Sequence, residues 1–218
     1  YEGIYVGFPV LFNPAGAVPP PHMNYTALNQ VELTTSRDLY HWHRVGDRAL
    51  FVGVDPWDGV NYGCAQNLLC GRPHVRDDEI WIYYNAYRFR GPQELYGDMV
   101  DAAYHDDIGA LCLAKLRLDG FISLDADHGT VVTEPFEWTD GSLWVNATVD
   151  GSLRVELLDA KTGNVVDGFG VEDCDTIQGD HIRGRLTWKT SKSPPGTVRA
   201  RFLLGGAHLY SFWTGEKP

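Results

Sequence analysis

The amino-acid sequence predicts an all-β protein. Apolar and polar residues alternate with a period of two along most of the chain, and Gly and Pro recur between the alternating segments. No window of about 11 residues shows a convincing amphipathic helix. With 218 residues, of which 44% are hydrophobic, the chain can form one large all-β domain or two small ones with a real core.

The second half of the chain has the clearest alternation and predicts a β-sandwich. Within residues 142–159, Asp150-Gly151 is a favoured type I′ turn, so the segment predicts a β-hairpin with one buried face. That face would consist of Leu143, Val145, Ala147, Val149, Leu153, Val155 and Leu157. Gly205-Gly206 predicts a second hairpin turn. The other strand candidates needed for a sandwich are residues 129–136, 185–189, 198–204 and 207–213.

The first half has longer and more aromatic candidate strands joined by long loops. The best candidates are residues 4–12, 31–36, 80–87 and 108–118. Long loops on a β scaffold are where binding and catalytic residues usually lie. A boundary near Asp119-Gly120 gives two predicted domains, a β region with long loops over residues 1–118 and a β-sandwich over residues 119–218.

Charge and composition restrict the partners. The formal net charge is -11, and a field of that sign repels phosphate backbones, so we expect no nucleic-acid partner. No apolar run approaches the roughly 20 residues of a membrane span, so we expect no membrane partner. No signal peptide is visible. Because the chain begins at Tyr1 rather than Met, we expect a processed product or a fragment, and the compartment stays open.

The four cysteines form no CxxC pair, which argues against a zinc site. Apolar neighbours around Cys64, Cys70 and Cys112 predict buried free thiols, since free Cys behaves as a small hydrophobe. A Cys64–Cys70 disulfide is the alternative.

Residues 55–62 (DPWDGVNY) place two carboxylates and two large aromatic rings in one loop. Aromatic faces bind the apolar C–H patches of sugar rings, which favours Trp57 and Tyr62 as ligand contacts. Glycoside hydrolysis needs two carboxylates across the scissile bond, so Asp58 is a catalytic candidate. An ordinary acidic turn with a tryptophan that caps the core is the alternative interpretation.

Two further segments carry candidate catalytic groups. Residues 98–107 contain Asp101 and His105, which suit acid/base catalysis, a structural calcium ion, or only a solvated acidic loop. Glu2 lies beside two tyrosines and is a general-acid candidate if it is buried near the other acids.

The strand predicted over residues 80–87 has aromatic residues on both faces. One face is a candidate binding platform that involves Tyr84, Tyr87 and the following Arg88. Burial of both faces is the alternative. In residues 36–42, Asp38 is expected to accept hydrogen bonds from backbone amides in a turn, with Trp42 packed beneath it, and a catalytic Asp38 is the minor alternative.

Several short sequence segments, spread across most of the chain, resemble bacterial proteins related to glycoside hydrolase families 32 and 43. They are residues 1–3 (YEG), 33–42 (LTTSRDLYHW), 57–58 (WD), 80–84 (IWIYY), 108–125 (IGALCLAKLRLDGFISLD), 143–146 (LWVN), 153–159 (LRVELLD), 173–174 (DC), 179–180 (GD), Trp188 and 209–212 (LYSF). The resemblance implies the end of a five-bladed β-propeller followed by a β-sandwich, and a carbohydrate substrate. The expected fold is therefore partial propeller-like antiparallel sheets followed by a jelly-roll-like β-sandwich.

The chain also departs from this family pattern. The first half can supply only about two blades, whereas a propeller closes with at least four. The blades that carry two of the three family acids would precede Tyr1, and Glu2 is the position that matches the later acid. If the chain is complete, its open sheet edges must be covered by the sandwich or by another copy, which implies a homo-oligomer.

The favoured functional hypothesis is a glycoside hydrolase with Asp58, Glu2, Asp101 and His105 as catalytic candidates. Its substrate contacts would be Trp57, Tyr62, Tyr84, Tyr87 and Arg88, and no cofactor is expected beyond a possible structural calcium ion. The first alternative is a non-catalytic carbohydrate-binding module that uses exposed Trp and Tyr residues. The second is a structural β-sandwich that mediates assembly.

Overall fold

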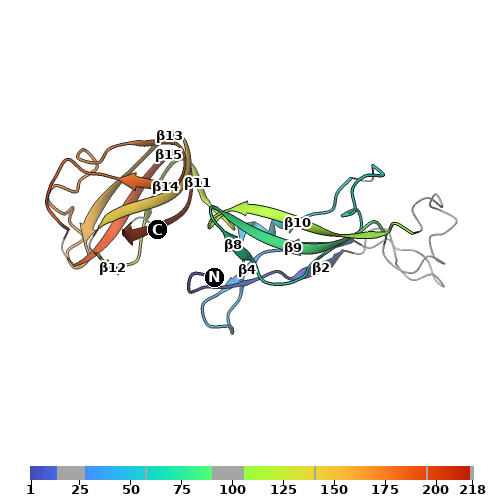
Figure 1. Cartoon of the computed structure of the whole chain (residues 1–218). Coiled ribbons are helices and arrows are strands. Elements are labelled where there is room, and N and C mark those ends of the chain that lie inside the picture. Colours follow the sequence, from blue (N-terminus) through green and yellow to red (C-terminus); the bar gives the residue numbers. More distant parts are fainter. Residues whose placement is uncertain (14–27, 57, 90–105, 140, 195, 217–218) are drawn as a thin grey trace. The chain divides into compact units, whose positions relative to one another are not determined.

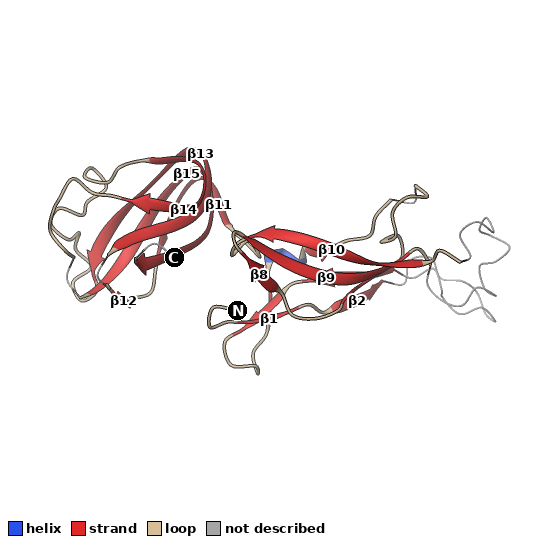
Figure 2. Ribbon diagram, viewed as in Figure 1, coloured by secondary structure: helices blue, strands red, loops and turns tan. Residues whose placement is uncertain are grey.

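The structure of the chain is a computed structural model, shown in Figures 1 and 2. It describes residues 1–13, 28–56, 58–89, 106–139, 141–194 and 196–216. The protein is all-β, as the sequence predicts: these residues form strands, and their one helical element is a 3₁₀ turn, η1 (Gly46–Arg48). The chain divides into two compact units, Tyr1–Leu116 and Arg117–Pro218.

The first unit contains two open sheets. A three-stranded antiparallel sheet has the order β1-β4-β5. Its strands are β1 (Tyr5–Gly7), β4 (Thr34–Ser36) and β5 (His43–Arg44). A seven-stranded sheet has the order β10-β9-β7-β3-β2, with β6 paired to β3 and β8 paired to β9. Its strands are β2 (Val10–Asn13), β3 (Leu28–Glu32), β6 (Leu50–Val52), β7 (Gln66–Leu69), β8 (His74–Arg76), β9 (Glu79–Tyr87) and β10 (Gly109–Arg117).

Two predicted strands of this unit are divided between the two sheets, and the expected strand over residues 4–12 is one of them, since it forms β1 and most of β2. The expected strand over residues 31–36 is in fact the end of β3 and all of β4, with Leu33 between them. Val31 and Leu33 are both buried, so the periodic apolar pattern continues across the break. The alternation therefore predicted extended chain over residues 31–36 but did not show that the chain changes sheets.

The second unit is built from one five-stranded antiparallel sheet of order β11-β15-β13-β14, with β12 paired to β15. The strands are β11 (Leu124–Val132), β12 (Phe136–Glu137), β13 (Ser142–Asp159), β14 (Ile177–Leu186) and β15 (Thr197–Gly215). β13 and β15 are 18 and 19 residues long and pair over nearly their whole length. They form the centre of the unit in Figure 1.

Both predicted hairpin turns of this unit are wrong. Asp150-Gly151 lies inside β13 and Gly205-Gly206 lies inside β15, and both strands continue through these residues. The register shifts between the pairs Val149–Ala207 and Ser152–Gly205, which marks a β-bulge. Asp150-Gly151 and Gly205-Gly206 thus bend two paired strands at the same point instead of reversing the chain.

The bend lets one sheet surround a single core. If it were straight, an 18-residue strand would span roughly 60 Å. Residues from both ends of β13 nevertheless belong to one buried cluster. The predicted apolar face is correct: Leu143, Val145, Ala147, Val149, Leu153, Val155 and Leu157 are all buried in it. Phe202, Leu204, Ala207 and Leu209 of β15 complete the cluster on both sides of its own bulge. The bent sheet therefore supplies both layers of the predicted sandwich.

Candidate functional site

Arg88 is the centre of a buried polar network in the first unit. It follows β9 directly, and its side chain is 3% exposed. Its Nε donates to the carbonyl of Asn61 at 3.1 Å, and one Nη donates to the carbonyls of Gly59 and Val60 at 3.2 Å each. The other Nη donates to both the carbonyl and the carboxylate of Asp107 at 2.8 Å. The guanidinium therefore holds the loop before β7 against the residues that lead into β10.

Tyr62 and Asp107 complete this network. The Arg88 guanidinium lies over the Tyr62 ring, 4.1 Å from its centroid, and the Tyr62 hydroxyl donates to the Asp107 carboxylate at 2.7 Å. That hydrogen bond raises the pKa of Tyr62, and together with the Arg88 cation it lowers the pKa of Asp107. The structure thus brings together two predicted substrate contacts, Tyr62 and Arg88. It adds Asp107, which the sequence analysis placed in an acidic loop without a role of its own.

Asp58 anchors the turn of the same loop. Its carboxylate accepts hydrogen bonds from the amides of Val60 and Asn61 at 2.8 Å and from the Asn61 side chain at 2.7 Å. The amide of Asn61, followed by that of Val60, lowers the pKa of Asp58. An ionised carboxylate in an exposed turn suits a base, a nucleophile or a loop anchor, and does not suit a proton donor at neutral pH.

The other catalytic candidates are not joined to Asp58 in the described part of the chain. Asp101, His105 and Trp57 lie outside the described residues. Glu2 is exposed in an N-terminal turn with φ of 43°, where the amide of Ile4 donates to the carbonyl of Tyr1 at 2.8 Å. The paired-carboxylate site of a glycosidase therefore stays a prediction.

The two faces of β9 differ, because successive side chains of a strand point to opposite sides. Tyr84 shares a face with buried Ile80 and Ile82, and burial raises its pKa. Tyr83 and Tyr87 lie on the opposite face, where Tyr83 is 39% exposed. Tyr84 and Tyr87, both predicted as substrate contacts, therefore lie on opposite faces of β9.

Trp81 extends the exposed face of β9 and was missed by the sequence analysis, although it alternates in register with Tyr83 and Tyr87. The Arg76 guanidinium lies 4.8 Å from its ring centroid and the Lys115 ammonium 4.7 Å. Lys115 also pairs with Glu79 at 2.9 Å. Leu111 and Leu113 of β10 are exposed as well.

A shallow pocket of about 360 Å³ lies beside Tyr87. Gly109 in its wall has no side chain, and an added Cβ there would lie 2.8 Å from the Tyr87 ring. Asn85 and Asp106 line the same pocket, together with Ile108, Ala110 and Leu111. One aromatic ring, one amide and one carboxylate therefore border a single open hollow.

The predicted turn at Asp38 is confirmed. Its carboxylate accepts from the amides of Tyr40 and His41 at 2.9 and 2.8 Å and contacts the His41 ring at 2.6 Å. The His41 side chain, more than the amides, lowers the pKa of Asp38. Trp42 packs next to Gly7, where an added Cβ would lie 2.9 Å from the indole. These contacts support the structural interpretation of residues 36–42.

The cysteines differ from expectation. All four are free, but Cys70 is exposed and Cys64 and Cys112 are only half-buried, so the predicted burial of these three is wrong. Cys174 is the buried one. Within the described ranges, no three His, Cys, Asp or Glu side chains gather as a metal site would require. None of the helical structure described is long and apolar enough to cross a bilayer.

Comparisons with known proteins identify no relative of this chain. No protein-family model matches the chain, and neither a curated protein nor a solved structure matches it. The finding that stands is an all-β protein with several antiparallel sheets.

Proposed function

We propose that this protein binds a carbohydrate on the exposed face of β9 and β10, with Tyr87 stacked on a sugar ring. The observation that carries the proposal is the pocket in which Tyr87, Asn85 and Asp106 meet. A sugar ring has an apolar C–H face and a polar hydroxyl rim, and it needs partners for both. Tyr87 supplies the ring face, and Asn85 and Asp106 accept hydrogen bonds from hydroxyl groups.

The surroundings of the pocket favour a chain of sugars over a small isolated ligand. Beyond the pocket, the same face of β9 continues to Tyr83, which is 39% exposed. Side chains on one face of a strand recur at every second position, about 6.6 Å apart. Tyr83 lies four positions from Tyr87, about 13 Å along the strand, so a ligand that contacts both rings must be longer than one sugar ring. The resemblance of the sequence to glycoside hydrolase families 32 and 43 favours the same ligand class.

Hydrolysis is the second candidate, and the ionised Asp58 favours it because a carboxylate is the form that a base or nucleophile requires. The shifted carboxyl groups of the described first unit, Asp38, Asp58, Glu79 and Asp107, all have lowered pKa values. A general acid requires the opposite shift. Binding therefore accounts for more of the described geometry than hydrolysis does.

Affinity electrophoresis in gels that contain xylan, arabinan, glucan or fructan tests the proposal. At least one polysaccharide should retard the wild-type protein. Tyr87→Ala and Asn85→Ala should each weaken that binding at least tenfold. Tyr40→Ala is the matched control, because Tyr40 is an exposed tyrosine in the turn at residues 36–42, outside β9, and this variant should bind like the wild type. Circular dichroism should show that each variant is folded.

Three results would overturn the proposal: no retardation by any polysaccharide, full binding by folded Tyr87→Ala, or equal losses in the Tyr40→Ala control. An assay of reducing-sugar release from the same polysaccharides distinguishes hydrolysis from binding alone. Release that disappears in Asp58→Asn while binding persists would show a hydrolase.

A further inference from the structure

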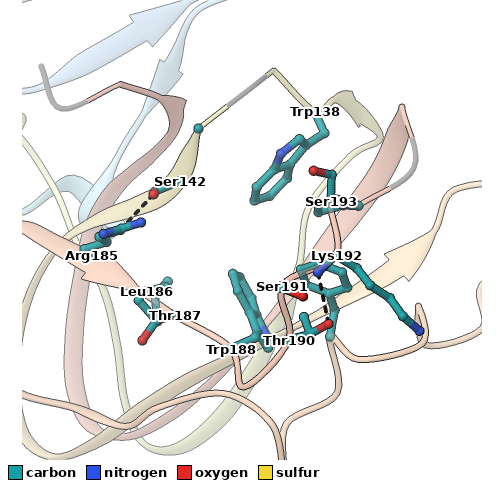
Figure 3. A pocket seen from close by; sticks show the side chains of 13 residues that line it. Trp138, Ser142, Arg185, Leu186, Thr187, Trp188, Thr190, Ser191, Lys192 and Ser193 are labelled. Carbon is teal, nitrogen blue, oxygen red and sulfur yellow. Dashed lines mark hydrogen bonds between the residues drawn. The ribbon is translucent and has the colours of Figure 1, made fainter.

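A second pocket lies within the C-terminal unit and has a different character. It is formed where the end of β14 and the following residues face Trp138 and Ser142, and its volume is about 210 Å³. Figure 3 shows Arg185 and Ser142 on one side of this hollow and Ser191 and Ser193 on the other, with two indole rings between them. It shares no lining residue with the pocket at Tyr87.

The aromatic walls of the pocket are fixed by packing. Trp138 and Trp188 meet edge to face, with centroids 6.5 Å apart and planes at 70°. Phe169 packs behind Trp188 at 5.3 Å, and the Trp188 indole donates to the carbonyl of Val155 at 3.1 Å. Both indoles also pack against the main core of the unit. A preformed wall loses little conformational entropy when a ligand binds.

Arg185 brings a cation to the edge of the pocket. Its Nε donates to Ser142 Oγ at 2.8 Å, which orients the guanidinium beside the hollow. Within the described ranges, Arg185 forms no ion pair with a carboxylate. Lys192, the other cation of the lining, is paired with Asp167 and points away from the hollow in Figure 3. The pocket therefore offers one oriented guanidinium whose Nη groups remain available.

The guanidinium, the two indoles and the hydroxyls together favour one class of ligand. A guanidinium binds a planar carboxylate through two parallel hydrogen bonds. Indole rings cover apolar ring faces, and the hydroxyls of Ser191 and Ser193 can exchange hydrogen bonds with sugar hydroxyls. The volume is below the roughly 300–1,000 Å³ of pockets for drug-sized ligands, so it suits one ring. We propose that this pocket binds a single uronic-acid residue, with its carboxylate on Arg185 and its ring against Trp138.

The test compares two probes that differ in one group, methyl β-D-glucuronide and methyl β-D-glucoside, with the galacturonide and galactoside pair beside them. Binding to the full chain is followed by NMR of the indole N–H resonances. At least one uronide should bind at least tenfold more tightly than its neutral counterpart. Arg185→Met should remove that preference, and Trp138→Phe should weaken binding of the same uronide.

Two control variants show whether the preference belongs to this pocket. Lys192→Met removes a cation of the same lining that is already paired, and it should retain the uronide preference. Tyr87→Ala should also retain it, so failure at one site leaves the other proposal standing. Equal affinity for uronide and neutral sugar, no binding of any uronide, or an unchanged preference in folded Arg185→Met would overturn the inference.

Discussion

Gly151 and Gly205 face each other across β13 and β15 so closely that a Cβ added to Gly151 would lie 2.4 Å from the Gly205 carbonyl oxygen. No side chain fits between them, since Cβ atoms do not approach a carbonyl oxygen within 3.0 Å. The contact lies at the bulge where both long strands bend. Absence of a side chain at Gly151 is therefore a condition for the bend.

Gly151→Ala should lower the free energy of unfolding of the C-terminal unit by about 1–3 kcal/mol, because the strands must separate to admit the methyl group. Chemical denaturation followed by tryptophan fluorescence measures the change. Gly170→Ala is the control, since its added Cβ would meet only ordinary contacts at 3.6 and 3.8 Å. A similar loss in both variants would contradict this account of the bend.

Arg88→Met should destabilise the first unit by about 2–4 kcal/mol, because it leaves the carbonyls of Gly59, Val60 and Asn61 without their donor. Thermal unfolding provides the measurement. Lys115→Met, which breaks an exposed pair with Glu79, should have little effect on stability. If the two substitutions prove equally mild, Arg88 does not hold the loop.

Asp38 should contribute to acid unfolding. Its pKa is lowered in the folded protein, so it stabilises the fold above its unfolded pKa, and that stability is lost as the pH falls below about 3.8. Asp38→Asn should reduce the dependence of stability on pH in that acidic range, and His41→Ala should reduce it in the same direction. Denaturation curves at a series of pH values measure this, and an unchanged slope would refute the role of the pair.

Cys70 should react with iodoacetamide well before Cys174 in the native protein. Cys70 is exposed, whereas burial raises the pKa of the Cys174 thiol and so lowers its thiolate fraction. Peptide mass spectrometry over a time course of labelling at a mildly alkaline pH gives the order. In denaturant the two rates should become similar. Early labelling of Cys174 in the native state would contradict its burial.

The alternation of apolar and polar residues predicts which face of a strand is buried. It does not predict features that depend on the strand with which that segment pairs. The face of Leu153, Val155 and Leu157 is correct because a period of two follows from strand geometry alone. The turns predicted at Gly151 and Gly205 are wrong because glycine serves both tight turns and bulges, and only the pairing partner decides between them.

In the candidate site, too, the sequence indicates single residues but not the contacts between distant ones. Tyr62 and Arg88 could be selected by residue type, but their common partner Asp107 is 45 residues from Tyr62, and no local pattern joins them. The pocket at Arg185 was not selected at all. It forms only when Trp138 and Trp188, 50 residues apart in the sequence, are brought edge to face by the fold.

The bent pair of β13 and β15 also limits where the chain of this unit can be cleaved or extended. In a sandwich of two separate sheets, connecting loops offer places where the chain can be nicked or extended with little harm. Here the crossing between the layers lies inside the continuous strand β13, and pairing with β15 holds on both sides of the bulge, at Val149 and at Ser152. An insertion at that point would disturb the strand pairing in both layers at once. We therefore expect neither layer to stay folded when the other is disrupted there.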